Sequence, residues 1–210
     1  MIALLSFLRL VPLLAALAAA AALPALSSRT ASSNDAPRIL RRQIIDTCPE
    51  IEKSVIMDGQ AMTQTVTFKI GHVTGPKTCK AEVAVDYDVA WQHAVSEINW
   101  LGHVDLSDSS IALVQLSYGF TGGNQQRRYR WSINGPTEGE WRQHTTIEPD
   151  RMVWSKCGEE DQLSVDWNVA LQSTQPGVPA VGELGNANAR GGPLALRMVM
   201  DWRRCEKGRP

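Results

Sequence analysis

The sequence predicts an all-β protein, a two-layer antiparallel β-sandwich that contains two disulfides. Apolar and polar residues alternate with a period of two in many short segments, which is typical of strands with one buried face. Gly, Pro, Asn and Asp separate these segments at short intervals, as turns do. No segment of useful length shows a helical period, and the four cysteines form an even set. Together these observations favour a sandwich over a helical or parallel fold.

The first expected strands form a hairpin. Residues 53–57 are followed by Asp58-Gly59, which is a strong turn signal, and then by residues 61–70. The second segment alternates polar residues with Val66, Phe68 and Ile70, so one of its faces is expected to be buried.

Two further alternating segments follow this hairpin. Residues 79–89 have the clearest period of two in the chain. Residues 94–100 repeat the pattern, and residues 102–106 form a short connection or strand. In the segment 94–100, one face is expected to carry Ala94, Ser96, Ile98 and Trp100.

The middle of the chain predicts a central strand and its neighbours. Residues 110–121 are apolar on both faces over several positions, which predicts a strand covered on both sides. Residues 140–147 alternate again. Between these two, residues 128–134 are expected to point Tyr129, Trp131 and Ile133 inward.

The last third of the chain combines two strands with a long loop. Residues 152–157 lead into residues 162–172, which alternate cleanly. Residues 173–192 are rich in Pro, Gly, Asn and Ala and predict a long surface loop, and residues 193–205 form the last strand. The pattern therefore predicts nine or ten short strands, as a sandwich requires.

The first 42 residues predict export and processing. Residues 1–22 are almost wholly apolar and end in small residues, as a secretory signal peptide does. Residues 23–42 form a polar pro-segment or linker that ends in the dibasic pair Arg41-Arg42. Cleavage there would begin the mature domain, residues 43–210, at Gln43. The alternative is that Arg38, Arg41 and Arg42 form a solvated basic patch.

The charge balance excludes two classes of partner. The chain has a formal net charge of −1, and residues 1–42 hold five arginines against one aspartate, so their removal would leave −5. Nucleic acids and anionic membranes both require a basic surface, and neither is expected as a partner. No second apolar stretch is long enough to span a membrane, so no membrane association is expected once the signal peptide is removed.

The four cysteines predict two disulfides in an exported protein. Cys48, Cys79, Cys157 and Cys205 allow three connectivities, and the sequence alone does not choose among them. A zinc site is the competing interpretation. The cysteines lack the close Cys-x-x-Cys spacing that such sites use, so no metal is expected.

A series of motifs resembles a fungal family. They occur in the order Cys48-Pro49, Lys77-Thr78-Cys79, Tyr118-Gly119-Phe120-Thr121-Gly122, Asn134-Gly135-Pro136, Val153-Trp154-Ser155-Lys156-Cys157-Gly158 and Asp201-Trp202-Arg203-Arg204-Cys205.

The series resembles the secreted fungal proteins of the domain of unknown function 4360 family, over nearly all of residues 48–205. The resemblance implies an exported, β-rich protein of a filamentous fungus and supplies no activity. Family order and strand adjacency predict the pairs Cys48–Cys79 and Cys157–Cys205. The charged residues His103, Asp105 and Asp108 depart from what the resemblance leads us to expect in a short link.

No catalytic or cofactor-binding motif stands out. The histidines lie in four separate segments, and Ser155 follows a tryptophan in a disulfide corner instead of a nucleophile elbow. The cluster Glu159-Glu160-Asp161 resembles a solvated turn more than a buried catalytic pair. Neither aspartate pair in the sequence has the other ligands of a calcium loop. The four histidines are His72, His93, His103 and His144, and the two aspartate pairs are Asp86/Asp88 and Asp105/Asp108.

The seven tryptophans carry the functional hypothesis. Trp131, Trp167 and Trp202 lie in phase with apolar neighbours and are expected in the core. Polar residues flank the other candidates, Trp91, Trp100 and Trp141, which would stack on a sugar ring or a partner protein if exposed. Packing in the interior is the competing interpretation, because large aromatic side chains usually bury most of their area.

The sequence thus predicts a secreted, non-enzymatic protein, extracellular or associated with the cell wall, that binds a polysaccharide or an extracellular protein. One alternative is an effector-like protein that binds a host or competitor protein, with residues 173–192 as a variable surface. The other is a secreted hydrolase acting on polysaccharide.

Overall fold

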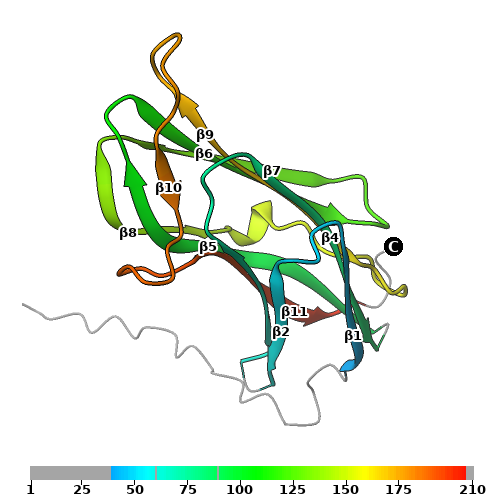
Figure 1. The fold of residues 1–210 in the computed structure, drawn as a ribbon. Coiled ribbons are helices and arrows are strands. Elements are labelled where there is room, and N and C mark those ends of the chain that lie inside the picture. Colours follow the sequence, from blue (N-terminus) through cyan, green and yellow to red (C-terminus); the bar gives the residue numbers. More distant parts are fainter. Residues whose placement is uncertain (1–38, 60, 89, 207–210) are drawn as a thin grey trace, which may run out of the picture. The chain divides into compact units, whose positions relative to one another are not determined.

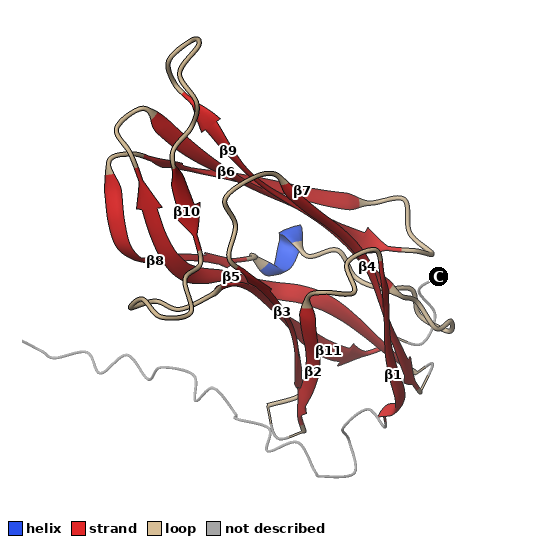
Figure 2. Ribbon diagram, in the orientation of Figure 1, coloured by secondary structure: helices blue, strands red, loops and turns tan. Residues whose placement is uncertain are grey.

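The computed structural model describes residues 39–206 except 60 and 89, and its ribbon consists almost entirely of strands (Figure 1; Figure 2). One short 3-10 helix, Pro149–Arg151, follows β8. The predicted signal peptide and most of the predicted pro-segment lie outside the described residues. The strands are β1 (Ile39–Asp46), β2 (Glu52–Asp58), β3 (Thr63–Gly71), β4 (Lys77–Tyr87), β5 (Trp91–Leu106), β6 (Ser110–Phe120), β7 (Gln126–Asn134), β8 (Thr137–Thr146), β9 (Leu163–Ser173), β10 (Gly182–Leu184) and β11 (Leu194–Arg204).

These strands form two antiparallel sheets. Sheet A has the order β1-β4-β9-β6-β7. In sheet B, β2, β3, β11 and β5 are neighbours in that order. On β5, β11 pairs with residues 91–101 and β10 with residues 104–106, whereas β8 pairs with residues 97–106. Because a strand has only two edges, β10 and β11 lie end to end on one edge of β5 and β8 lies on the other.

The core lies between the two sheets. The buried side chains of β4, β9 and β11 recur at alternate positions, so each strand turns one face to the core and the other to solvent. The largest fully buried side chains come from both sheets and include Trp100, Trp167, Tyr118 and Phe68. The predicted all-β sandwich is confirmed. Within the described part of the chain, no helix is long and apolar enough to cross a bilayer.

Both predicted disulfides are confirmed. Cys48 pairs with Cys79 at a Cα–Cα distance of 5.5 Å, and Cys157 pairs with Cys205 at 5.7 Å. The first joins the segment after β1 to β4. The second joins the segment that links the two sheets to the end of β11.

Several element boundaries differ from the predictions. β10 lies inside the predicted loop 173–192, and residues 94–106 belong to one long strand. β6 was expected to be covered on both sides, but only its inner face is fully covered, and Gln115 on its outer face is exposed. β1 pairs with β4 and begins before the predicted start of the mature domain, because backbone pairing at a sheet edge does not require a strongly apolar sequence.

The face of 94–100 also differs from the prediction. Opposite β11 the register shifts, since Val199 pairs with Glu97 and Met200 with Val95, which leaves Ser96 as an extra residue. This bulge reverses the alternation along β5. His93 and Val95 therefore face the core before the bulge, and Ile98 and Trp100 face it afterwards.

Candidate functional site

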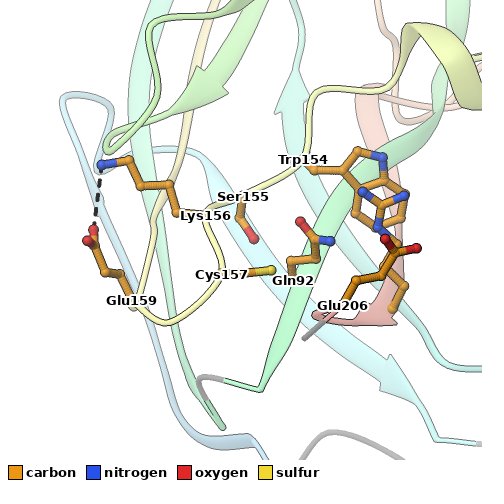
Figure 3. A pocket seen from close by; sticks show the side chains of 8 residues that line it. Gln92, Trp154, Ser155, Lys156, Cys157, Glu159 and Glu206 are labelled. Carbon is orange, nitrogen blue, oxygen red and sulfur yellow. Dashed lines mark ion pairs between the residues drawn. The ribbon is translucent and has the colours of Figure 1, made fainter. Parts of the chain in front are cut away.

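A pocket of about 620 Å³ lies beside the Cys157–Cys205 disulfide (Figure 3). Its walls come from the start of β5, the end of β11 and the segment between β8 and β9. The side chains that line it combine one aromatic ring with amide, cationic and carboxylate groups. They are Gln92, Trp154, Ser155, Lys156, Cys157, Glu159, Arg203 and Glu206.

The segment that carries Trp154 is held against β5 by its backbone. Trp154 forms an isolated antiparallel bridge with Ala94. The Ser155 amide donates to the His93 carbonyl at 2.8 Å, and the His93 amide donates to Ser155 Oγ at 2.9 Å. This segment therefore continues the edge of sheet B beyond β8, and the positions of its side chains are set by β5.

Asp161 fixes the other end of this segment. Its carboxylate accepts hydrogen bonds from the Gly122 amide at 2.7 Å, Thr121 Oγ1 at 3.1 Å and the Lys156 amide at 3.2 Å. The residue is 3% exposed, so these bonds satisfy a buried charge. Of the predicted solvated cluster Glu159-Glu160-Asp161, only the two glutamates are exposed.

Trp154 and Arg203 form a stacked pair in the wall of the pocket. The guanidinium carbon of Arg203 lies 3.7 Å from the centroid of the Trp154 ring, within the range of a cation–π contact. The Gln92 side chain bonds to both Arg203 and the Trp154 segment when its amide is oriented so that the oxygen and the nitrogen each have a hydrogen-bond partner. Its oxygen accepts from Arg203 Nε at 2.8 Å and Nη2 at 3.2 Å, and its nitrogen donates to the Ser155 carbonyl at 3.1 Å.

The opposite rim carries a separate ion pair. Lys156 Nζ lies 3.6 Å from the Glu159 carboxylate, and both side chains are largely exposed. In Figure 3 this pair lies on the opposite side of the pocket from Trp154 and Glu206, with Gln92 and Cys157 between them. The lining holds two cations and two carboxylates, so it carries no formal charge excess.

The residues Ser155, His93 and Asp161 do not form a catalytic triad. Ser155 Oγ lies 3.4 Å from His93 Nδ1, but the hydroxyl is buried and also accepts from the His93 amide. Asp161 is occupied by the three donors described above. The His93 imidazole packs against the aromatic rings of Tyr87, Phe120 and Trp202. Burial lowers the pKa of His93 to about 4, against the opposing effect of Asp161.

For two of the three candidate tryptophans, the hypothesis of ligand stacking is wrong. Trp91 is 6% exposed and Trp100 is 1% exposed, so neither can present a ring face to a ligand. Their polar sequence neighbours point to the other face of β5, and both rings face the core. Trp141 on β8 is partly buried and packs against the core. Of the predicted core residues, Trp167 and Trp202 are buried, whereas Trp131 is half-buried and stacks on Tyr129.

The other three histidines do not share one site, since His72 and His103 both lie near the Glu183 carboxylate and His144 has other partners. His72 Nε2 lies 2.7 Å from Glu183, and His103 Nδ1 lies 3.1 Å from the Arg190 carbonyl. His144 contacts Asn99 and Thr146 on the outer face of sheet B. Over residues 39–206, apart from the two undescribed positions, no group of three His, Cys, Asp or Glu side chains could hold a metal ion.

The sequence reasoning missed Trp154, Arg203 and Gln92 as site residues. A signal for two of them was present, because Trp154 precedes Cys157 by three residues and Arg203 precedes Cys205 by two. A Cys157–Cys205 bridge necessarily brings those two side chains near each other. Gln92 gave no such signal, because only the pairing of β5 with β11 places it opposite Arg203.

The comparisons with known proteins identify the family. The model of the family "Domain of unknown function (DUF4360)" matches residues 46–205. The chain belongs to the DUF4360 family. The resemblance noted from the ordered motifs is thereby confirmed, and the matched span of this DUF4360 protein contains all four cysteines and the whole Trp154 segment.

One relative of this DUF4360 protein is described as an "Uncharacterized secreted protein" of Arthroderma benhamiae. It is 24% identical over 137 residues, which cover 60% of this chain and 56% of the relative. This chain therefore spans little more than half the length of that relative. The relative is secreted and this chain has two disulfides, as exported proteins do, so the predicted extracellular localisation is confirmed.

Among solved structures, the chain is similar to that of TmCBM61 in complex with β-1,4-galactotriose. The TM-score is 0.27 and the identity is 8%, over 78% of this chain and 88% of that one.

Proposed function

We propose that this DUF4360 protein is an extracellular or cell-wall-associated binding protein and that its Trp154 pocket binds a polysaccharide. The observation that carries the proposal is the stacked pair of Trp154 and Arg203 in the pocket lining, with the Gln92 amide beside it and two glutamates among the lining residues. Arg203 covers one face of the indole ring, and the rest of this half-buried side chain supplies apolar surface for the C–H side of a sugar ring. Amides, guanidinium groups and carboxylates supply the directional hydrogen bonds that sugar hydroxyls need.

The rigidity of the pocket supports the proposal. Asp161, the Ala94 bridge and the Cys157–Cys205 disulfide all hold the segment that carries Trp154. A wall that is already ordered costs little conformational entropy when a ligand binds. The absence of a formal charge excess in the lining favours a neutral polysaccharide over a strongly charged one.

The test is a pull-down of the purified secreted protein on insoluble chitin and β-glucan. We expect the wild-type protein to be retained on at least one polymer and Trp154→Ala to bind about tenfold or more weakly, since a central aromatic commonly contributes at least 1.4 kcal/mol. Trp141→Ala is the matched control, because Trp141 is also partly buried but does not line this pocket.

Circular dichroism and thermal unfolding would verify that each variant is folded before its retention is compared. Equal retention of the wild type and Trp154→Ala would reject the pocket as the site. No retention of the wild-type protein on either polymer would reject binding of these polysaccharides and leave an extracellular protein partner as the better hypothesis.

A further inference from the structure

The outer face of sheet A carries two parallel rows of polar side chains. Each row crosses β4, β9, β6 and β7, and a groove of about 450 Å³ runs over the part contributed by the last three strands. One row is Lys80, Asp166, Ser117 and Arg128, and the next is Thr78, Asn168, Gln115 and Arg130.

The groove is locally cationic in a chain of formal net charge −1. The two rows hold three cations and one carboxylate. That carboxylate, Asp166, lies 3.8 Å from Lys80 Nζ. The two side chains form an exposed ion pair, which contributes little to stability. Within the described part of the chain, Arg128 and Arg130 have no ion-pair partner on the protein, and both side chains are exposed. Two guanidinium groups are thus available to an outside anion.

The spacing of these groups suits an extended ligand. Side chains two residues apart on a strand are separated by about 7 Å, and neighbouring strands by about 4.8 Å. A guanidinium can hold a carboxylate with two parallel hydrogen bonds. Gln115 lies between Asn168 and Arg130 in the register, so amide donors and acceptors stand beside the second guanidinium.

We propose that this face binds an acidic polysaccharide, an extended chain that carries carboxylate groups at regular intervals. Arg128 and Arg130 bind two of these carboxylates, and Ser117, Gln115 and Asn168 on the neighbouring strands bind hydroxyl groups of the same polysaccharide. A peptide that extended the sheet would pair with the free edge of β7, whereas the groove lies across the face of the sheet. This surface is distinct from the Trp154 pocket and does not depend on it.

Affinity electrophoresis of the purified secreted protein in polygalacturonate gels tests the proposal, with neutral dextran as the reference polymer. We expect the wild-type protein to be retarded by polygalacturonate at low ionic strength and released as salt is added. The double variant Arg128→Gln/Arg130→Gln should lose about tenfold or more of this affinity. Arg128→Lys/Arg130→Lys should recover only part of it, because lysine cannot form the bidentate contact.

Arg142→Gln is the matched control, because Arg142 is exposed on β8 in the other sheet and pairs with Glu140. It should bind polygalacturonate like the wild type. The proposal is overturned if polygalacturonate does not retard the wild type, or if the double glutamine variant binds equally well. Equal affinity for poly-glutamate would also overturn it, since the surface would then recognise acidic protein segments.

Discussion

His93 illustrates how tertiary packing changes the chemistry of a single residue. Sequence reasoning treated it as one of four isolated histidines, and the structure places it among the rings of Tyr87, Phe120 and Trp202. The cationic form of a buried imidazole is poorly solvated, and this lowers its pKa to about 4. His93 is therefore neutral at ordinary pH, and the stability of the core depends on its remaining neutral.

This burial predicts a specific dependence of stability on pH. The folded state resists protonation of His93 down to about pH 4, whereas the unfolded chain takes up the proton near the ordinary value of 6.5. Neutral His93 therefore contributes to the free energy of unfolding above pH 6.5, and this contribution is lost as the pH falls toward 4. The total loss is on the order of 3 kcal/mol. Urea unfolding of the wild type and His93→Phe at several pH values measures it.

His93→Phe keeps an aromatic ring in the cluster and removes the titration. We expect its free energy of unfolding to fall less steeply than that of the wild type between pH 6.5 and 4. Other groups titrate in both proteins, so the difference between the two slopes is the quantity to compare. Identical slopes would show that His93 does not titrate differently in the folded and unfolded states.

At the scale of elements, β1 raises the question of processing. Residues 39–42 pair with β4, although Arg41-Arg42 is the predicted dibasic cleavage site. Cleavage after Arg42 would leave residues 43–46 paired with residues 81–84, next to the Cys48–Cys79 disulfide. That remaining strand is short, but the disulfide keeps its end beside β4.

We predict that the secreted protein begins at Gln43, with the glutamine partly cyclised to pyroglutamate. The physical reason is that a dibasic protease acts on an extended chain, and this segment is reachable before it pairs with β4. Intact-mass measurement and N-terminal sequencing of the secreted protein would establish its first residue. An N-terminus upstream of Ile39 would instead mean that β1 is retained whole. Arg42→Gln is the control that should block the cleavage.

At the scale of the whole domain, the Cys157–Cys205 disulfide joins the connection between the sheets to the end of β11. We predict that Cys157→Ser/Cys205→Ser lowers the free energy of unfolding by about 2 to 5 kcal/mol, because the unfolded chain regains the freedom of a long loop. Reduced yield of secreted protein should accompany this loss. Urea unfolding of the double variant would measure the loss of stability.

Lys156→Ala is the control for this variant. Its side chain is exposed and its pairing with Glu159 is a surface ion pair, so the free energy of unfolding should change by no more than about 0.5 kcal/mol. A double serine variant as stable as Lys156→Ala would show that the bridge contributes nothing beyond local geometry.

The sequence by itself determined the sandwich, because period-two alternation depends only on which side chains can leave water. It also indicated the cysteine pairs, through their order among the family motifs. Together, the two results locate the Trp154 and Arg203 segments at one end of the domain. They do not specify which side chains form a site there.

Only the tertiary structure decided which aromatic rings are accessible. Polar neighbours made Trp91 and Trp100 candidates for ligand stacking, but the pairing of β5 with β11 includes a bulge at Ser96, and the changed alternation turns both rings toward the core. The same pairing sets Gln92 opposite Arg203 and so orders the wall of the pocket. Register and the phase of alternation after a bulge depend on contacts between strands far apart in the chain. A local pattern cannot contain that information.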